Sequence, residues 1–224
     1  MKRVKLFTTL VLIFIVVFSL QGFLRRYLNE RKVLKKVIQR LQADSRVAEV
    51  LVTGVNYDED KKKLFTTIKF LEYGTDRKPL EPKYFTFSGN IIQFQSLVIR
   101  FDDNYVREAD ALRGKSIFLF WKVFILDGAD TQEYEITKVK EIPEGYKIEG
   151  LSSPFEKKFW REFWKYALDP KQGSQRGIKN AQIEAPGTMF VPGIIYTIKI
   201  EHDGGLRIDP AAIPEVLKGE KIIK

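Results

Sequence analysis

The sequence predicts a mainly β (α+β) fold: an antiparallel β-sandwich or open barrel with one aromatic amphipathic helix, preceded by a transmembrane helix and a basic stalk helix. Three observations lead to this prediction. Short apolar segments with a period of two recur after residue 46, with turn residues about every 8–15 positions. Residues 153–168 have the period of a helix instead. A run of 19 uncharged residues stands near the start of the chain.

The composition excludes several kinds of chemistry. The 224 residues are 44% hydrophobic and 30% charged, which is typical of a globular protein. The chain has no cysteine and a single histidine. Thiol catalysis, disulfide scaffolds, zinc fingers and iron–sulfur clusters are therefore excluded, as are metal sites that need several histidines from one chain. We expect no cofactor.

The net charge of +9 belongs to the N-terminal part of the chain. Three basic residues precede the uncharged run, and residues 25–40 carry a net positive charge of six. The remaining residues, 41–224, hold equal numbers of acidic and basic side chains. A nucleic-acid-binding domain carries its positive excess on the folded part, so we expect no nucleic-acid partner.

The uncharged run, residues 6–24, is expected to cross the lipid bilayer. As a helix it spans about 28 Å, close to the hydrocarbon thickness of a membrane. A cleaved signal peptide is the alternative, but the run contains no good small-x-small pattern of the kind that a cleavage site requires. Basic side chains on both flanks can extend to the headgroups and are expected at the membrane interface: Lys2, Arg3, Lys5, Arg25 and Arg26.

The orientation of this anchor depends on two opposing arguments. The larger basic flank after the run favours a cytoplasmic domain. Moving a short tail with three cations outward would oppose the membrane potential, which favours the N-terminus inside. We expect the second argument to win. The chain is then a single-pass protein of the plasma (inner) membrane with residues 25–224 outside.

Residues 25–45 are expected to form the basic stalk helix, because apolar residues recur at spacings of three and four. Three roles remain open for it. The apolar positions of residues 24–41 form a partial heptad, which would make a homodimer beside the membrane. The basic side chains would alternatively lie on anionic headgroups. The helix would otherwise pack on its own domain.

The domain that follows begins with two predicted hairpins. Residues 46–55 and 64–73 alternate and are joined by a charged turn. Residues 84–87 and 91–101 follow, joined by a Ser-Gly-Asn turn. Together these four segments predict two antiparallel hairpins at the start of the domain.

The best core candidate is the almost continuously apolar run of residues 116–126. Such a run suits a central strand that is covered on both faces. A further hairpin is predicted around residues 142–145, between strands at 134–140 and 146–149.

The predicted helix of residues 153–168 starts with a capping box and has proline in its first turn. One stripe of it is aromatic and includes Trp160 and Trp164. These side chains are candidates for binding a lipid, a glycan or another protein. The alternative is that the aromatic stripe packs in the core.

The last part of the chain combines an irregular stretch with a hairpin. Residues 169–193 are rich in glycine and proline, with a possible short strand near residues 181–183. Residues 194–201 and 206–209 alternate around an Asp-Gly-Gly turn, and residues 210–218 are predicted to form a short helix. Basic residues of the irregular stretch are candidates for binding an anion, and a flexible surface loop is the alternative: Lys171, Arg176 and Lys179.

Two sites are candidates for chemistry. His202 lies beside carboxylates at a predicted turn and would act as a general base, or else bond the turn backbone. Asp127, Asp130 and Glu133 cluster after the apolar run, as in a cation site, but they do not match the EF-hand spacing. A polar turn explains them equally well.

These observations divide the chain into a cytoplasmic tip and anchor (1–24), the stalk (25–45) and a β-rich domain (46–224) with a possible subdivision near residue 151. They favour a membrane-anchored protein that is not an enzyme. Its domain would bind another cell-envelope component, such as an envelope protein. The alternatives are an anchored envelope hydrolase using His202 or the Asp127/Asp130 cluster, and a lipid- or glycan-binding module using the aromatic helix.

Overall fold

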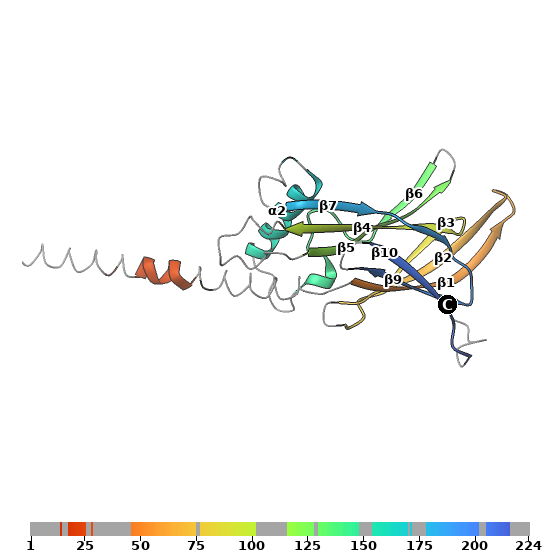
Figure 1. Cartoon of the computed structure of the whole chain (residues 1–224), viewed down its shortest axis with the longest axis horizontal. Helices are drawn as coiled ribbons and strands as arrows, with labels where there is room; N and C mark the ends of the chain where they lie inside the picture. Colours follow the sequence, from red (N-terminus) through yellow and green to blue (C-terminus); the bar gives the residue numbers. More distant parts are fainter. Residues whose placement is uncertain are drawn as a thin grey trace, which may run out of the picture.

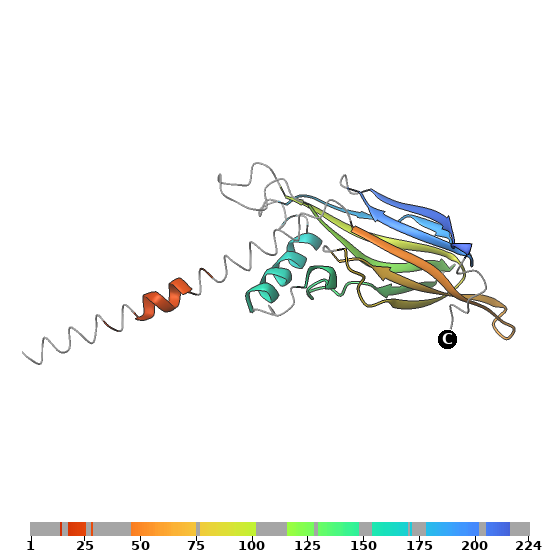
Figure 2. The same cartoon turned by 90° about the horizontal axis from the view of Figure 1, so that it is seen from below.

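The computed structural model describes residues 14, 18–25, 28, 46–74, 77–101, 116–127, 130–147, 154–169, 171, 178–201 and 205–215. The described part is mainly β, with two antiparallel sheets that face each other as a sandwich (Figures 1 and 2). This confirms the predicted β class and the antiparallel architecture.

The first sheet has the strand order β10-β9-β1-β2-β3. Its strands are β1 (Arg46–Asp58), β2 (Lys63–Glu72), β3 (Lys83–Ser88), β9 (Ile194–Ile200) and β10 (Leu206–Ala212). The strongest local reason for these strands is the period of two. In β9, for example, Tyr196, Ile198 and Ile200 are buried while the residues between them are half-buried.

The second sheet has the order β6-β5-β4-β7, and a short strand, β8, also pairs with β4. Its strands are β4 (Ile91–Phe101), β5 (Ser116–Asp127), β6 (Asp130–Glu135), β7 (Ile178–Glu184) and β8 (Gly187–Met189). The helix α2 (Pro154–Leu168) packs on the outer side of this sheet, and a 3₁₀ turn (Glu144–Tyr146) lies beside it.

The core between the two sheets is rich in aromatic side chains. Phe70 lies at its centre, with its ring centroid 5.5 Å from that of Phe120, 5.6 Å from that of Phe94 and 6.4 Å from that of Phe85. All four rings are buried. Edge-to-face and offset pairs of this kind add stability beyond the area that they bury.

A second apolar core lies between the second sheet and α2. Leu97, Ile99, Ile117 and Leu119 point away from the sandwich core and contact the helix. Because their neighbours Val98, Phe118 and Phe120 are buried between the sheets, this half of β4 and β5 is covered on both faces. The prediction that residues 116–126 form a central, doubly covered strand is confirmed for this half.

Two predicted elements were wrong, and a third was only partly right. The hairpin around residues 142–145 does not form, because β6 ends at Glu135 and residues 144–146 are a 3₁₀ turn. The possible short strand near residues 181–183 is part of β7, but the rest of β7 and the strand β8 lie in the stretch that was predicted as irregular. The segment predicted as a helix from residue 210 begins as the last part of β10, which runs to Ala212.

The strands on the two sides of residue 151 share both sheets. β7 pairs with β4, and β9 pairs with β1. The described elements therefore provide no separate C-terminal unit that would correspond to the subdivision considered near residue 151.

The exposed edge of β3 is bonded by side chains from β6. Thr86 O accepts a hydrogen bond from Tyr134 Oη (2.8 Å), and Ser88 N donates one to Gln132 Oε1 (2.8 Å). These bonds join the two sheets along one side of the sandwich. They also occupy backbone groups with which another strand would pair.

The outer edge of β10 also offers fewer backbone N–H donors to an added strand, but for a different reason. Leu206 N donates to Glu184 Oε2 (2.9 Å), so this N–H points away from β9. Pro210 lies four residues after Leu206, so its backbone nitrogen is on the same edge of the strand. Because proline has no N–H, this position cannot donate a hydrogen bond either. Strand addition at β10 would therefore lack two of its hydrogen bonds.

Most of the predicted anchor and stalk lies outside the described residues. Phe14, Leu28 and residues 18–25 are helical where they are described, and Phe18, Phe23 and Leu24 are exposed. Among the helices in the described part, none is both long and apolar enough to cross a membrane. Of the five predicted interface cations, only Arg25 is described, and it is exposed.

Candidate functional site

The sandwich has two ends that differ in character. At one end, here called the proximal end, β1 begins and α2 packs (Figures 1 and 2). At the opposite, distal end lie the turn between β1 and β2 and the last described residues of the chain (Figure 1).

Apolar side chains remain exposed at the distal end. On the outer face of the second sheet, Ile91 of β4 pairs with Met189 of β8. On the other side of β4, Gln93 pairs with Phe124 of β5. The same register, continued by two residues, places Leu126 opposite Ile91. All three apolar side chains of this row are exposed: Ile91 to 59%, Met189 to 53% and Leu126 to 65%. The row therefore continues the outer face that α2 covers at the proximal end, but without a cover.

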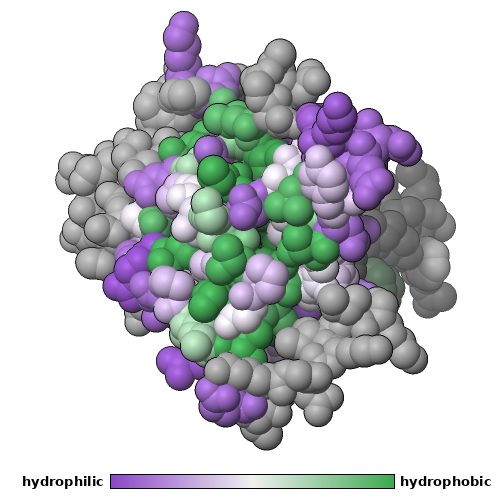
Figure 3. Space-filling view, turned by 90° about the vertical axis from the view of Figure 1, so that its right-hand side faces the viewer, coloured by the Kyte–Doolittle hydropathy of each residue, from purple (hydrophilic) through white to green (hydrophobic). Residues whose placement is uncertain are grey.

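Two further strands extend this surface across the end of the sandwich. Val55 and Leu64 are exposed on the β1–β2 hairpin, and Val191 is exposed after β8. Figure 3, which looks at the distal end, shows a band of apolar residues with hydrophilic ones on both sides. We call this surface the distal apolar patch and define it by six residues: Val55, Leu64, Ile91, Leu126, Met189 and Val191.

The backbone near the patch is held in place by its turns. Gly89, between β3 and β4, has a φ of 137°, which favours glycine, and bridges to Phe65 of β2. At the β1–β2 turn, Asp58 Oδ1 accepts a hydrogen bond from Lys61 N (3.0 Å). This bond is the largest cause that lowers the pKa of Asp58 below its ordinary value.

Charges beside the patch are paired rather than of one sign. Lys122 Nζ lies 3.0 Å from Glu133 Oε1 on the outer face of the second sheet. Lys61 Nζ lies 3.5 Å from Asp58 Oδ2 at the hairpin turn. The hairpin turn itself, residues 58–63, contains three acidic and three basic residues. The surroundings of the patch therefore do not select a strongly charged partner.

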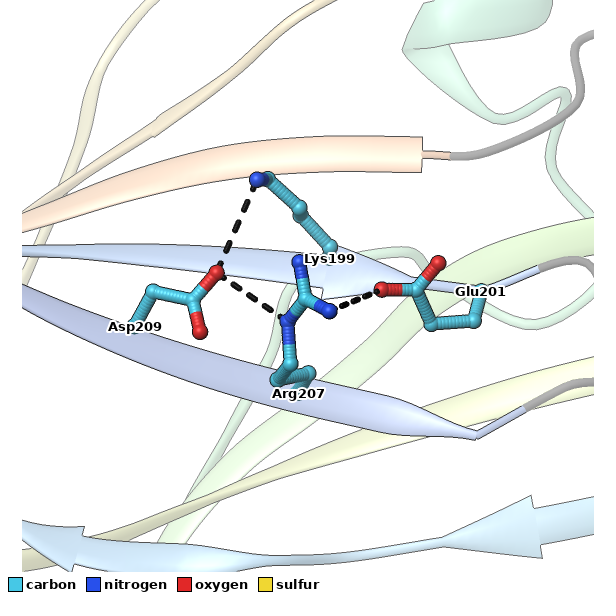
Figure 4. Close-up of polar contacts among 4 residues, drawn as sticks. All are labelled: Lys199, Glu201, Arg207 and Asp209. Atoms are coloured by element: carbon cyan, nitrogen blue, oxygen red, sulfur yellow. Dashed lines mark hydrogen bonds and ion pairs between the residues drawn. The ribbon is translucent and has the colours of Figure 1, made fainter.

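The candidate base, His202, lies outside the described residues, but its flanking strands are described. The carboxylate beside it, Glu201, has Oε1 3.1 Å from Arg207 Nη1 (Figure 4). Arg207 Nε also lies 3.1 Å from Asp209 Oδ2, which is 3.6 Å from Lys199 Nζ. In this network Glu201 is therefore paired with Arg207, and the charges of two cations are balanced by two carboxylates.

The acidic residues near the β5–β6 hairpin do not form a cluster in the described part. Asp127 and Asp130 are paired across the hairpin, whereas Glu133 is paired with Phe124, about 10 Å further along the strand. Glu133 is engaged by Lys122. Within the described ranges, no three histidine, aspartate or glutamate side chains are placed to hold a metal ion.

Of the remaining site residues, the two tryptophans are the best described. Trp160 is fully buried and Trp164 is 1% exposed, so both lie in the core under α2, as the alternative interpretation had it. Lys171 is exposed. Arg176 is outside the described residues, and Lys179 is described only as part of the backbone of β7.

The patch residues were not singled out from the sequence, although a signal was present. The apolar run of β5 continues to Leu126, and a 12-residue strand is about 40 Å long. A 15-residue helix is only about 22 Å long. One helix therefore cannot cover the whole outer face of this strand, and the uncovered apolar positions fall at the distal end.

One electrostatic feature of the first sheet gives a testable pH dependence. Tyr73 Oη donates a hydrogen bond to Glu49 Oε2 (2.8 Å). Burial, and then the hydrogen bond and negative charge of Glu49, raise the pKa of Tyr73 above 10.0. The neutral tyrosine is therefore favoured by folding. Its contribution to stability is complete below pH 10 and is lost as the pH rises through the raised pKa.

We expect Tyr73→Phe to lower the free energy of unfolding by about 1 kcal/mol at pH 7, because one hydrogen bond to a carboxylate is lost. Above about pH 10 the difference between the two proteins should shrink, since the wild type loses this contribution and the variant has none. Urea unfolding at several pH values measures both effects. A difference that stays constant up to pH 12 would contradict this assignment.

The fold and the patch together define a β-sandwich with one helix-covered sheet and an uncovered apolar end. Comparison with protein-family models, with curated proteins and with solved structures finds no significant match to this chain. The function is therefore argued from the residues themselves.

Proposed function

We propose that this chain is a single-pass membrane-anchored protein whose β-rich extracytoplasmic domain binds another protein of the cell envelope through the distal apolar patch. Residues 6–24 serve as the anchor, and the domain begins at the proximal end of the sandwich. The observation that carries the proposal is the row of Ile91, Leu126 and Met189, each more than half exposed. Contiguous exposed apolar surface is typical of interaction sites.

The position of the patch favours a protein over the anchoring bilayer as its occupant. The patch lies at the end opposite to the one where β1 begins, at which the proposed N-terminal anchor helix would join the domain (Figures 1 and 2). A domain held by that helix presents its distal end away from its own membrane.

The edge strands β3 and β10 also favour the distal apolar patch as the binding site. Backbone groups of β3 are bonded to β6, and β10 lacks two donors. Strand addition is therefore disfavoured at these edges. Burial of the six patch side chains against an apolar segment of the partner would supply the affinity, at about 25 cal/mol per Å² of apolar area.

The proposal is tested by site-specific photocrosslinking in intact cells, using full-length protein with a photoreactive residue at Leu126 or Ile91. We expect both positions to give one adduct of the same mass, larger than the chain and different from twice its mass. Tyr84, which is 59% exposed on β3 and away from the patch, is the matched control and should give no such adduct.

A second substitution links the adduct to the patch. Met189→Asp places a charge in the row and should reduce the adduct from Ile91 at least about tenfold, because burying an unpaired carboxylate is costly. An adduct of twice the chain mass would assign the patch to a second copy. Equal adducts from Tyr84 and Leu126, or none from either patch position, would overturn the proposal.

A further inference from the structure

The exposed side of α2 carries a stripe of positive charge. Lys157, Arg161 and Lys165 are all exposed and are spaced four residues apart, so they lie on one face of the helix. Leu168, three residues further on, continues the same stripe and is 40% exposed. We call these four residues the basic ridge.

The ridge is a local excess of charge on a domain that has none overall. Residues 41–224 are neutral in sum, whereas α2 contains four basic residues against two acidic ones, Glu156 and Glu162. The opposite side of the helix is buried against the second sheet through Trp160, Phe163 and Trp164. Because packing already fixes the helix, its exposed cations are held in a constant arrangement.

The ridge also lies at one particular end of the molecule. Figures 1 and 2 both show α2 at the proximal end, where β1 begins. The connecting segment, residues 25–45, contains seven basic residues against two acidic ones. Positive charge therefore gathers at the end of the protein that would lie nearest to the anchoring membrane.

We propose that the basic ridge binds the anionic headgroups of the bilayer in which the chain is anchored, and so holds the sandwich in one orientation on the membrane. This inference rests on the proposed anchor. Lysine and arginine side chains are attracted to an anionic membrane surface, and the effect extends over about one Debye length. Leu168 adds an apolar side chain that can enter the interface between these cations.

The absence of cysteine from the chain makes a direct test possible. The full-length protein is reconstituted into vesicles of phosphatidylcholine alone, or of phosphatidylcholine mixed with phosphatidylglycerol, each carrying a headgroup quencher. A fluorophore is attached to Leu168→Cys on the ridge. A second preparation carries it on Leu126→Cys in the distal apolar patch, which is also exposed.

We expect quenching at position 168 in the anionic vesicles only, and no quenching at position 126 in either. Salt at 1 M should remove the signal, because the screening length falls to about 3 Å. Reversing the three charges (K157E, R161E and K165E) should weaken binding of the ridge to the bilayer by about a hundredfold. The reason is that the attraction of three cations to the anionic surface is lost.

The matched control reverses three exposed lysines at the distal turn, Lys61, Lys62 and Lys63, and should leave the quenching unchanged. Circular dichroism of each variant checks that it is folded. If the protein floats with the vesicles but position 168 is not quenched, or is quenched equally in neutral vesicles, the ridge proposal is overturned while the anchor stands. If the protein does not float with either kind of vesicle, the anchor fails too.

Discussion

Replacing Phe70 by alanine is expected to lower the free energy of unfolding by about 3–5 kcal/mol. The side chain is 1% exposed and lies at the centre of the sandwich core, where its ring contacts those of Phe85, Phe94 and Phe120. The substitution removes a buried ring and leaves a cavity that three other rings cannot fill by small movements. A domain of ordinary stability would lose a large part of its margin.

Chemical unfolding followed by tryptophan fluorescence measures this effect. Phe70→Leu keeps most of the volume and should cost clearly less than the alanine variant. Tyr84→Ala removes an exposed aromatic residue from the neighbouring strand and should change stability by less than about 0.5 kcal/mol. Equal losses for Phe70→Ala and Tyr84→Ala would show that the core is not organised around Phe70.

Trp164→Ala should destabilise the second core by a similar amount, about 3–5 kcal/mol. The indole is buried between α2 and the second sheet, with its ring centroid 5.9 Å from Phe163 and 6.3 Å from Trp121. Its Nε1 also donates a hydrogen bond to Glu141 O (2.9 Å). The variant loses both the packing and the donor for this carbonyl oxygen.

Because the two cores lie on opposite faces of the second sheet, the loss is expected to be local first. Hydrogen exchange should accelerate in α2 and in residues 141–146 before it does in β1, β2 and β9. Trp164→Phe, which keeps an aromatic ring but not the donor, should cost less. Uniform acceleration of exchange throughout both sheets would contradict the separation of the two cores.

The period of two in the sequence was sufficient to locate most of the first sheet. β1, β2 and β9 lie within a few residues of the predicted strands, since each has one buried face that imposes alternation. The apolar run of β5 was also interpreted correctly as covered on both faces, where α2 packs on it. These features depend on local patterns that every strand of a sandwich repeats.

The wrong hairpin has a physical explanation in β5. Trp121 forms a bulge there, and its carbonyl oxygen accepts hydrogen bonds from both Ile136 N (2.8 Å) and Thr137 N (3.1 Å). The chain leaves the ladder at this point, so the alternation that continues beyond Glu135 does not belong to a strand. A bulge in one strand is not visible in the sequence of its neighbour.

Only residues 181–183 of β7 were predicted as a possible strand, because its pairing is entirely long-range. Its sequence is polar and follows a glycine-rich stretch, so it carries little strand signal. It pairs with β4, where Leu97 lies opposite Ile183 and Ile99 lies opposite Ala181. The apolar residues of β4, rather than those of β7, make this position in the sheet favourable.

The candidate site was less predictable than the fold. Of the chemistry-bearing residues considered from the sequence, Glu133 is engaged locally by Lys122. The patch arises from the register of β4, β5 and β8, which brings together Ile91, Leu126 and Met189 from three separate segments. Such convergence requires the pairing to be known.

The pairing of β9 with β1 has a consequence for biosynthesis. Ala48 lies opposite Ile198, so the two strands at the middle of the first sheet are about 150 residues apart in the chain. At roughly 5–20 residues per second, a ribosome needs about 8–30 s between making the first and the second. The polypeptide therefore remains without its complete hydrogen-bonded ladder until β9 has been made.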